Sequence, residues 1–565
     1  MITAHDKSVT SHLILLLIFL VPLFSFGISN HALWTPDEPR VAEIGREMAE
    51  TGNWAVPMLN RKPFLESPPL YYGVLAAFYR AFGVSDTVAR IPSAIFCFGS
   101  VVVLFFLSTR LFNARVGFLS AFVLATTGEF FRVAHWSIVD GALTFFVLCA
   151  MACFMAAYQS ESRRKVFLCY SLFYVFCTLG FYTKGFIGIV IPGIGVLVFI
   201  AFERNFRELV RMRLWFGAIL FIILTAPWLI ELWRQAGAEY LKIFFVHNHL
   251  QRFLPGSLAG SISGAASGHH NPFYYYITEF PAGFLPWSTL LVPVLIFVFS
   301  RQNRTFLEGS SFRRNTLFLK CWFFAGIAFL SVASTKRTLY LMPLFAPMSA
   351  LTGMYLEQLL TADRLKRYEK VFLSLLSVVV IMAGLVLVPA YYYLSTEYFS
   401  QTNGGFSVLL SVGALFSCFV IIWGLIQVKR CNVRKYCVSI IFSITVIYLG
   451  TLAYFFPLID KEKSFIPFCS EVKKTVPAGI PICGYEPDET VRAVIPFYTG
   501  NYMLEAADLE DLARIVKAGK PFFIVSRDHK SEKERELLNS GRFSPIIKKP
   551  MGRDRALLLF SYGLP

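Results

Sequence analysis

The sequence has few charged residues for its length. Asp, Glu, Lys and Arg make up 16% of the 565 residues, whereas 56% are hydrophobic and 58 are Phe. A soluble domain does not need so much apolar material to fill its core. The scarcity of charge therefore excludes an ordinary soluble protein and predicts a polytopic α-helical membrane protein.

Cysteine motifs are also missing. The 11 cysteines form no Cys-x-x-Cys pair and show no spacing typical of a metal site. Packing inside the hydrophobic segments is the expected role of nearly all of them. Cys469 and Cys483 follow the last hydrophobic segment and are the one pair considered for a disulfide.

What the chain does have is a series of apolar runs, each near the roughly 20 residues that cross a bilayer as a helix. About 13 such runs are predicted. They cover residues 12–29, 91–109, 116–131, 138–157, 166–182, 185–202, 214–232, 282–299, 316–333, 339–358, 371–393, 406–427 and 436–457.

The positions of Lys and Arg predict the orientation of these segments. With the N-terminus inside, every even-to-odd connection carries basic residues, for example Arg163, Arg164 and Lys165, as cytoplasmic loops do. The formal charge of +17 then reflects topology and contact with anionic lipids, so nucleic-acid binding is not expected. No small-residue cleavage site follows the first segment, so we expect it to be retained.

Two domains are predicted. Residues 1–457 form the transmembrane domain with outer-face loops 30–90 and 233–281, and residues 458–565 form a soluble α/β domain on the same outer face. The soluble part lacks a phosphate-binding loop and a nucleophile elbow, which favours a lid or scaffold over an independent enzyme. Its expected strands are Ile480–Tyr485, Pro521–Ser526 and Ala556–Tyr562, and its expected helices are Leu509–Ala518 and Lys530–Leu538.

The first outer loop contains a dense group of charges that begins at Asp37. Thr35 and Glu38 fit a capping box with Pro36 at the first helical position, and in the competing frame Asp37 is itself the cap. Both frames give Asp37 a structural role, whereas its place beside the first segment suits proton transfer at the membrane surface. Three pairs at helical spacing indicate a solvated face: Arg40/Glu43, Glu43/Arg46 and Arg46/Glu50.

Other polar residues of the outer face suit anion or metal binding. Glu66 lies among prolines that prevent a regular helix, and it either is solvated or supplies an oxygen ligand. Four of the nine histidines lie in one outer loop, at positions 247, 249, 269 and 270. The spacing of His247 and His249 does not place both on one helical face. Arg252 suits a phosphate.

Cations also occur at the outer ends of predicted segments, against the positive-inside rule. Lys184 and the pair Lys336 and Arg337 lie there. They either extend to lipid headgroups or bind a lipid-linked phosphate. Asp140 begins a segment on the same face and either caps that helix or pairs with one of these cations.

Several motifs together resemble the bacterial aminoarabinose transferases that modify lipid A, within the GT-C superfamily of protein O-mannosyltransferases and related polyprenyl-phosphate-sugar-dependent transferases. The matching motifs span nearly the whole chain. They are Asp37 to Arg40 with Glu43 to Met48, Gly52 to Pro57, Phe64 to Pro68, Thr183 to Gly185, His249 to Phe253, Pro272 to Tyr276 leading to Leu285 to Trp287, and Lys336 to Pro343.

The resemblance implies a role for each matching residue. Asp37 becomes the catalytic carboxylate, together with Glu38, and Glu66 and His249 become ligands of a divalent metal cation. The expected contacts to the donor phosphate or sugar are Arg40, Lys62, Lys184, Arg252, Lys336, Tyr340 and Asp140. One departure matters: Ser67 stands where these transferases usually have Lys, so one cation expected at the phosphate is lost, which leaves the identity of the sugar open.

The implied reaction is an inverting transfer of one sugar from an undecaprenyl phosphate carrier. The resemblance implies 4-amino-4-deoxy-L-arabinose as the sugar and lipid A as the acceptor, and the protein would act as a monomer on the periplasmic face of the bacterial inner membrane. Three alternatives remain open: mannosyltransferase-like transfer to protein or another glycan, a transporter or flippase of lipid-linked sugars, and a non-catalytic assembly protein. A transporter is expected to carry ionisable residues near mid-span, whereas the charges here gather at the outer ends.

Overall fold

The computed structural model describes residues 4–250, 271–300, 310–333, 335–398, 404–477, 479–516, 522–529, 532–551 and 555–562. The chain forms two compact units. Unit 1 contains residues 1–27, 65–68 and 93–455, and unit 2 contains residues 28–64, 69–92 and 456–565. Most of the first outer loop thus belongs to the same unit as the C-terminal segment, whereas the sequence places loop 30–90 with the transmembrane domain.

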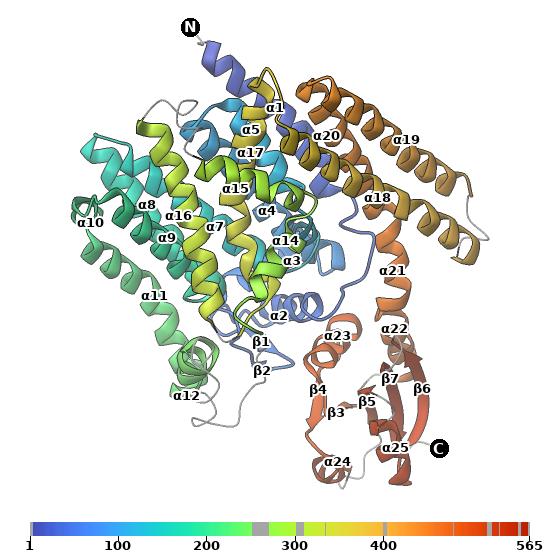
Figure 1. Cartoon of the computed structure of the whole chain (residues 1–565). Coiled ribbons are helices and arrows are strands. Elements are labelled where there is room, and N and C mark those ends of the chain that lie inside the picture. The colour runs from blue at the N-terminus through green and yellow to red at the C-terminus, as the bar shows by residue number, and fades with distance from the viewer. Residues whose placement is uncertain are drawn as a thin grey trace. The chain divides into compact units, whose positions relative to one another are not determined.

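Unit 1 is helical (Figure 1). Its elements are α1 (Ala4–Ser25), most of α4 (Asp86–Leu111), α5 (Ala114–Ala125), α6 (Gly128–Ala134), α7 (Asp140–Tyr158), α8 (Arg163–Lys184), α9 (Ile187–Glu203), α10 (Arg207–Met212), α11 (Leu214–Ala236), α12 (Ala238–Lys242), η1 (Ile243–Leu250), α14 (Tyr275–Gly283), η2 (Trp287–Leu290), α15 (Leu291–Phe299), α16 (Ser310–Val332), η4 (Thr338–Leu341), α17 (Met342–Thr361), α18 (Arg367–Tyr398), α19 (Gly404–Lys429), α20 (Val433–Gly450) and η5 (Thr451–Phe455).

Helices able to cross a membrane make up most of this unit. Within the described residues, 10 helices are long and apolar enough, and the number rises to 12 if each of two bent pairs is one span. The bent pairs are α5 with α6, at 71°, and α14 with the Trp287–Phe299 segment, at 114°. The remaining predicted segment, 185–202, corresponds to α9, which has only 17 residues. The prediction of a polytopic helical membrane protein is confirmed.

Small residues allow the closest helix packing in unit 1. A Cβ on Gly353 of α17 would lie 2.5 Å from Oγ of Ser120 on α5, and a Cβ on Gly188 of α9 would lie 2.2 Å from the backbone of Gly180 on α8. Apolar side chains gain little by leaving lipid for protein, so close contact between small residues is what favours helix association in a bilayer.

Unit 2 combines helices with two sheets (Figure 1). Its elements are α2 (Glu38–Thr51), β1 (Met58–Leu59), β2 (Lys62–Pro63), α3 (Leu70–Phe82), the first turns of α4, α21 (Phe456–Lys463), α22 (Ile466–Thr475), β3 (Ile482–Tyr485), α23 (Glu489–Thr499), β4 (Met503–Ala506), α24 (Leu509–Val516), β5 (Phe522–His529), α25 (Glu532–Asn539), β6 (Ser544–Pro550) and β7 (Arg555–Tyr562).

A five-stranded sheet with the order β4-β3-β5-β7-β6 organises the C-terminal part of unit 2. Strand β3 pairs in parallel with β4 and β5, and β7 pairs antiparallel with β5 and β6. Side chains alternate between the two faces of a strand, so Leu557 and Leu559 pack with α22 and α23, whereas Leu558 packs with α24 and α25. The predicted α/β domain is confirmed, with α22, α23, β4 and β6 as elements that were not predicted.

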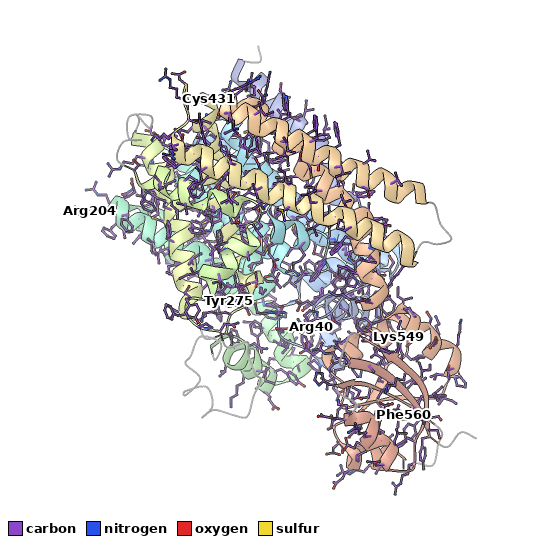
Figure 2. The ribbon with its side chains drawn as sticks, turned by 45° about the vertical axis from the view of Figure 1, so that its right-hand side comes forward. Arg40, Arg204, Tyr275, Cys431, Lys549 and Phe560 are labelled. Carbon is purple, nitrogen blue, oxygen red and sulfur yellow. The ribbon has the colours of Figure 1, made fainter. Side chains whose placement is uncertain are left out.

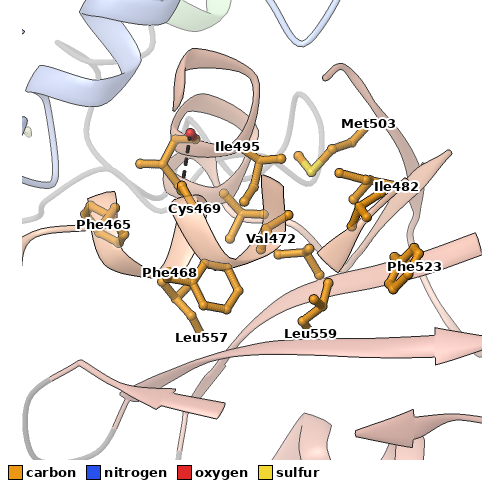
Figure 3. Packing of buried hydrophobic residues seen from close by; sticks show 14 residues of the cluster. Phe465, Phe468, Cys469, Val472, Ile482, Ile495, Met503, Phe523, Leu557 and Leu559 are labelled. Carbon is orange, nitrogen blue, oxygen red and sulfur yellow. Dashed lines mark hydrogen bonds between the residues drawn. The ribbon is translucent and has the colours of Figure 1, made fainter. Parts of the chain in front are cut away.

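The two cysteines considered for a disulfide are both free and buried. Cys469 lies on α22 in the cluster over one face of the sheet, where Figure 3 shows it beside Phe468 and Val472. Cys483 lies on β3 in the cluster over the other face. The two cysteines therefore do not form the disulfide that was considered, because the sheet separates their thiols.

Candidate functional site

A cavity of about 60 Å³ in unit 1 collects polar residues of four separate segments. Its polar lining comes from the short 65–68 segment, the end of α8, η1 and the chain before η4, and its apolar lining comes from α9 and the end of α16. The lining residues are Glu66, Ser67, Lys184, Ile187, Asn248, Leu330, Ala333, Thr335, Arg337 and Tyr340.

Lys184 is held from two sides. Its Nζ lies 2.5 Å from Oδ1 of Asp140 and 4.8 Å from the ring centroid of Tyr340. Gly185, with φ of 70°, ends α8 directly after Lys184, a conformation that residues with a Cβ rarely adopt. The predicted pairing of Asp140 with an outer cation is confirmed, and the ammonium remains in the cavity wall.

The segment that carries Glu66 and Ser67 is fixed by a hydrogen bond, in which Nδ2 of Asn248 donates to the Leu65 carbonyl oxygen over 2.7 Å. Arg252 lies outside the described residues, and so does the side chain of His249. Within the described part of the chain, no group of three His, Cys, Asp or Glu side chains is arranged to hold a metal ion. Glu66 shares the cavity with Lys184 and Arg337, and its role as a metal ligand together with His249 stays a prediction.

Arg337, and not Lys336, lines the cavity. Lys336 is only 4% exposed, and its ammonium donates to the carbonyl oxygens of Asn271 at 3.0 Å and Ala333 at 2.6 Å. Burial lowers the pKa of Lys336. The two cations are adjacent in an extended stretch, and side chains there alternate in direction. The sequence therefore predicts a pair of cations here but does not indicate which of the two side chains reaches the cavity.

Asp37 lies in unit 2, immediately before α2. The frame with Asp37 at the cap position holds, but its side chain makes no capping hydrogen bond. Instead, Oδ1 of Asp37 accepts from Nη2 of Arg40 over 2.9 Å. Arg40, which Figure 2 labels, also forms an ion pair with Glu489 of α23, and its guanidinium lies 5.3 Å from the ring centroid of Phe64. Asp37 is 5% exposed.

Glu38 has a different environment from Asp37. It accepts a hydrogen bond from the backbone N–H of Trp34 over 2.9 Å, and Nε of Arg90 lies 2.8 Å from its Oε1. Both side chains of this ion pair are fully buried. Arg90 also donates to the carbonyl oxygens of Ile28, His31 and Ala32. Through these contacts, the pair of Glu38 and Arg90 fixes the start of the outer loop.

The remaining charges of the first outer loop differ from the expected solvated face. Glu43 and Glu47 are at most 1% exposed, because α2 packs against α3 and α23 within unit 2. The expected pairs of Arg46 with Glu43 and Glu50 both form, whereas Arg40 pairs elsewhere. The prediction of a solvated face is wrong for the buried carboxylates, since α23 comes from a part of the chain far away in sequence.

Lys62 is the other predicted phosphate contact of unit 2. It lies on β2 with 63% of its side chain exposed, and its Nζ forms an ion pair of 2.7 Å with Glu505 of β4. Glu505 also binds Arg492 at 3.0 Å and the side-chain amide of Asn60 at 2.8 Å. The structure therefore places Lys62 at a contact between the β1–β2 hairpin and the five-stranded sheet.

Comparison with known proteins supports the resemblance found in the sequence. Residues 9–241 match the family model of dolichyl-phosphate-mannose-protein mannosyltransferases. The undecaprenyl phosphate-alpha-4-amino-4-deoxy-L-arabinose arabinosyl transferase of Erwinia tasmaniensis is 31% identical over 346 residues, covering 60% of this chain and 59% of that one. One of the Proteus mirabilis proteins with this name is 32% identical over 365 residues, covering 63% and 60%. The chain thus spans about three fifths of the length of these relatives.

Solved structures match over more of the chain. The crystal structure of ArnT from Cupriavidus metallidurans bound to undecaprenyl phosphate aligns with a TM-score of 0.74 at 20% identity, covering 97% of this chain and 98% of that one. The chain has an ArnT-like GT-C fold. The archaeal oligosaccharyltransferase from Archaeoglobus fulgidus is more distant, with a TM-score of 0.53 at 13% identity, covering 100% of this chain and 75% of that one. The fold predicted from the sequence is confirmed.

Proposed function

We propose that this protein is an inverting glycosyltransferase that moves 4-amino-4-deoxy-L-arabinose from undecaprenyl phosphate to lipid A. The names of similar curated relatives support this sugar and carrier, and the undecaprenyl phosphate bound to ArnT in its crystal structure supports the carrier. The single observation that carries the proposal in this chain is the composition of the cavity in unit 1.

The cavity suits an anionic headgroup attached to a hydrocarbon chain. One part of its wall offers N–H and O–H donors, from Lys184, Arg337 and Tyr340, that can bind phosphate oxygens. Another part is formed by Ile187, Leu330 and Ala333, which can contact an isoprenoid. A polyprenyl phosphate carries both a phosphate and a hydrocarbon chain, whereas a soluble sugar nucleotide has no hydrocarbon chain to contact the apolar wall.

In the proposed reaction, an acceptor oxygen attacks the anomeric carbon of the sugar while the bond from that carbon to the phosphate oxygen breaks. The bonding electron pair leaves with the phosphate, whose growing negative charge is stabilised by the ammonium of Lys184 and the guanidinium of Arg337. Attack from the face opposite the phosphate inverts the anomeric centre. A phosphate acceptor is already anionic, so Asp37 mainly orients it, whereas Asp37 would take the proton of a hydroxyl acceptor.

Asp140 completes the proposed donor site. Asp140 fixes the ammonium of Lys184 at the end of α8, so the cation is already in place when the phosphate arrives. We place the reaction on the periplasmic face of the bacterial inner membrane, because the basic residues between predicted spans favour that orientation.

Removal of the chain from its host tests this proposal. We expect mass spectrometry of lipid A to show the loss of the aminoarabinose-substituted species, and the wild-type chain supplied in trans should restore them. Asp37→Asn should be inserted normally and fail to restore them. Glu50→Gln changes an exposed carboxylate on the same helix and should restore them fully. Unchanged lipid A together with an altered exported glycoprotein would contradict lipid A as the acceptor.

A further inference from the structure

The Asp37–Arg40 pair is part of a chain of three charges that ends on the soluble part of the protein. Nη2 of Arg40 binds Oδ1 of Asp37 at 2.9 Å, and Nη1 of the same guanidinium forms an ion pair with Glu489. The side chain of Arg40 is 11% exposed and that of Asp37 is 6% exposed, whereas Glu489 is 51% exposed. A buried pair therefore reaches solvent through a carboxylate of α23.

Glu489 is attached to a fixed point of the fold. It is the first residue of α23, and Oδ1 of the preceding Asp488 caps this helix by accepting from the Val491 N–H over 2.9 Å. Oδ2 of Asp488 accepts from Arg527 of β5 over 2.9 Å, and Arg527 also donates to Thr490 over 2.8 Å. The central sheet thus sets the position of the helix start that carries Glu489.

A guanidinium held by two carboxylates has a defined direction. Arginine can bind one carboxylate through two parallel N–H bonds, and this arrangement is the strongest that such a pair forms. With Glu489 in place, Nη1 is directed to Glu489 and Nη2 to Asp37. Without Glu489, Arg40 can turn its whole fork onto Asp37, which would neutralise that carboxylate more completely.

We propose that Glu489 is a positioning residue that keeps Arg40 from closing onto Asp37, and so makes the soluble domain part of the transfer machinery. The inference rests on the proposed function of Asp37. It gives the soluble domain a part in the reaction, although the sequence of this domain contains no enzyme motif. It also explains why an exposed acidic residue lies at the start of α23, on the helix that packs against α2.

Steady-state transfer by the purified full-length protein in liposomes, with undecaprenyl phosphate-linked aminoarabinose as donor and lipid A as acceptor, tests the proposal. Glu489→Gln keeps the size of the side chain and removes its charge. We expect kcat to fall roughly fivefold to tenfold while KM for the donor stays within twofold, because the donor cavity is untouched. Glu489→Asp should recover most of the lost kcat.

Glu532→Gln is the matched control, since Glu532 is an exposed carboxylate in the first turn of α25 in the same domain. It should leave kcat and KM unchanged. Wild-type transfer together with an unchanged kcat for Glu489→Gln would overturn the positioning role alone. A fall in kcat that Glu489→Asp does not reverse would also overturn it, because the loss would then come from a general disturbance of the start of α23. A wild-type protein that transfers no sugar would overturn the proposed function and this inference with it.

Discussion

Nε of Arg90 lies 2.8 Å from Oε1 of Glu38, and neither side chain is exposed to solvent. Removing one member of such a pair leaves an uncompensated charge in the interior, which typically costs about 3–5 kcal/mol. We therefore expect Arg90→Met to lower the stability of the folded protein by an amount of this order, measured by thermal unfolding in detergent.

The companion variants separate structure from catalysis at Glu38. Arg90→Met combined with Glu38→Gln should be more stable than Arg90→Met alone, because the orphaned carboxylate is gone. Glu38→Gln alone should lose transfer only in proportion to its loss of folded protein. A stable Glu38→Gln protein without transfer activity would instead show that Glu38 has the catalytic role implied by the resemblance.

Lys184 is expected to contribute to donor affinity and, through its ion pair with the buried Asp140, also to stability. Lys184→Met removes a charged donor from the cavity wall, and we expect the affinity for undecaprenyl phosphate to fall roughly tenfold, the effect of one charge-assisted hydrogen bond. Binding to the purified protein can be measured by thermophoresis. Lys320→Met is a suitable control, because Nζ of Lys320 lies 4.9 Å from the ring centroid of Phe299 in a similar contact away from the cavity. Equal affinities for the two variants would remove Lys184 from the donor site.

The neighbouring cations Lys336 and Arg337 should respond differently to replacement. Arg337→Gln is expected to weaken undecaprenyl phosphate binding while the unfolding temperature stays close to that of the wild type, since Arg337 lines the cavity. Lys336→Met should instead lower the stability by about 1–3 kcal/mol, because the carbonyl oxygens of Asn271 and Ala333 lose their donor. The opposite pattern would return Lys336 to the donor site, as the sequence suggested.

The sequence predicts the membrane fold and the contact of Lys184 with Asp140 well, for a physical reason. Bilayer thickness acts on local composition, so each expected segment corresponds to a helix or a bent pair of helices. The contact of Lys184 with Asp140 could be anticipated because both residues lie at the outer ends of their helices. Local sequence is sufficient in these cases.

What the sequence does not predict depends on partners that are distant along the chain. Glu43 and Glu47 have the spacing of a solvated helix face, yet both are buried in unit 2, where α2 packs against α3 and α23. The same holds for Glu489, which no motif connects with Arg40. Whether Lys336 or Arg337 lines the cavity depends on side-chain direction in an extended segment. Two adjacent cations in the sequence do not indicate that direction.

A rise in pH is expected to destabilise the fold through Glu47. Burial raises the pKa of this carboxyl to about 7 from its ordinary 4.5, against the opposing effects of the Arg61 N–H and of Arg46. Between these two pH values the folded chain holds a proton that the unfolded chain has lost. The free energy of unfolding should therefore fall as the pH rises from about 4.5 to about 7 and level off above this window.

Comparison with two variants isolates this contribution. Glu47→Gln cannot titrate, so the unfolding temperature should depend less on pH between 5 and 8 than in the wild type. Glu532→Gln alters an exposed carboxylate in the first turn of α25 and should keep the wild-type dependence. If Glu47→Gln retains the full wild-type slope, another group carries the pH dependence.

The proposed reaction requires Asp37 on the periplasmic side, which cysteine labelling can test. Thr51 is exposed at the end of α2 and Arg207 is exposed at the start of α10, and the predicted topology places them on opposite sides of the membrane. A membrane-impermeant maleimide added to intact spheroplasts should label Thr51→Cys above the background of the native cysteines and leave Arg207→Cys at that background. After lysis, both should react. Labelling of Arg207→Cys but not Thr51→Cys before lysis would place α2 in the cytosol, where no undecaprenyl phosphate-linked donor could meet an exported acceptor.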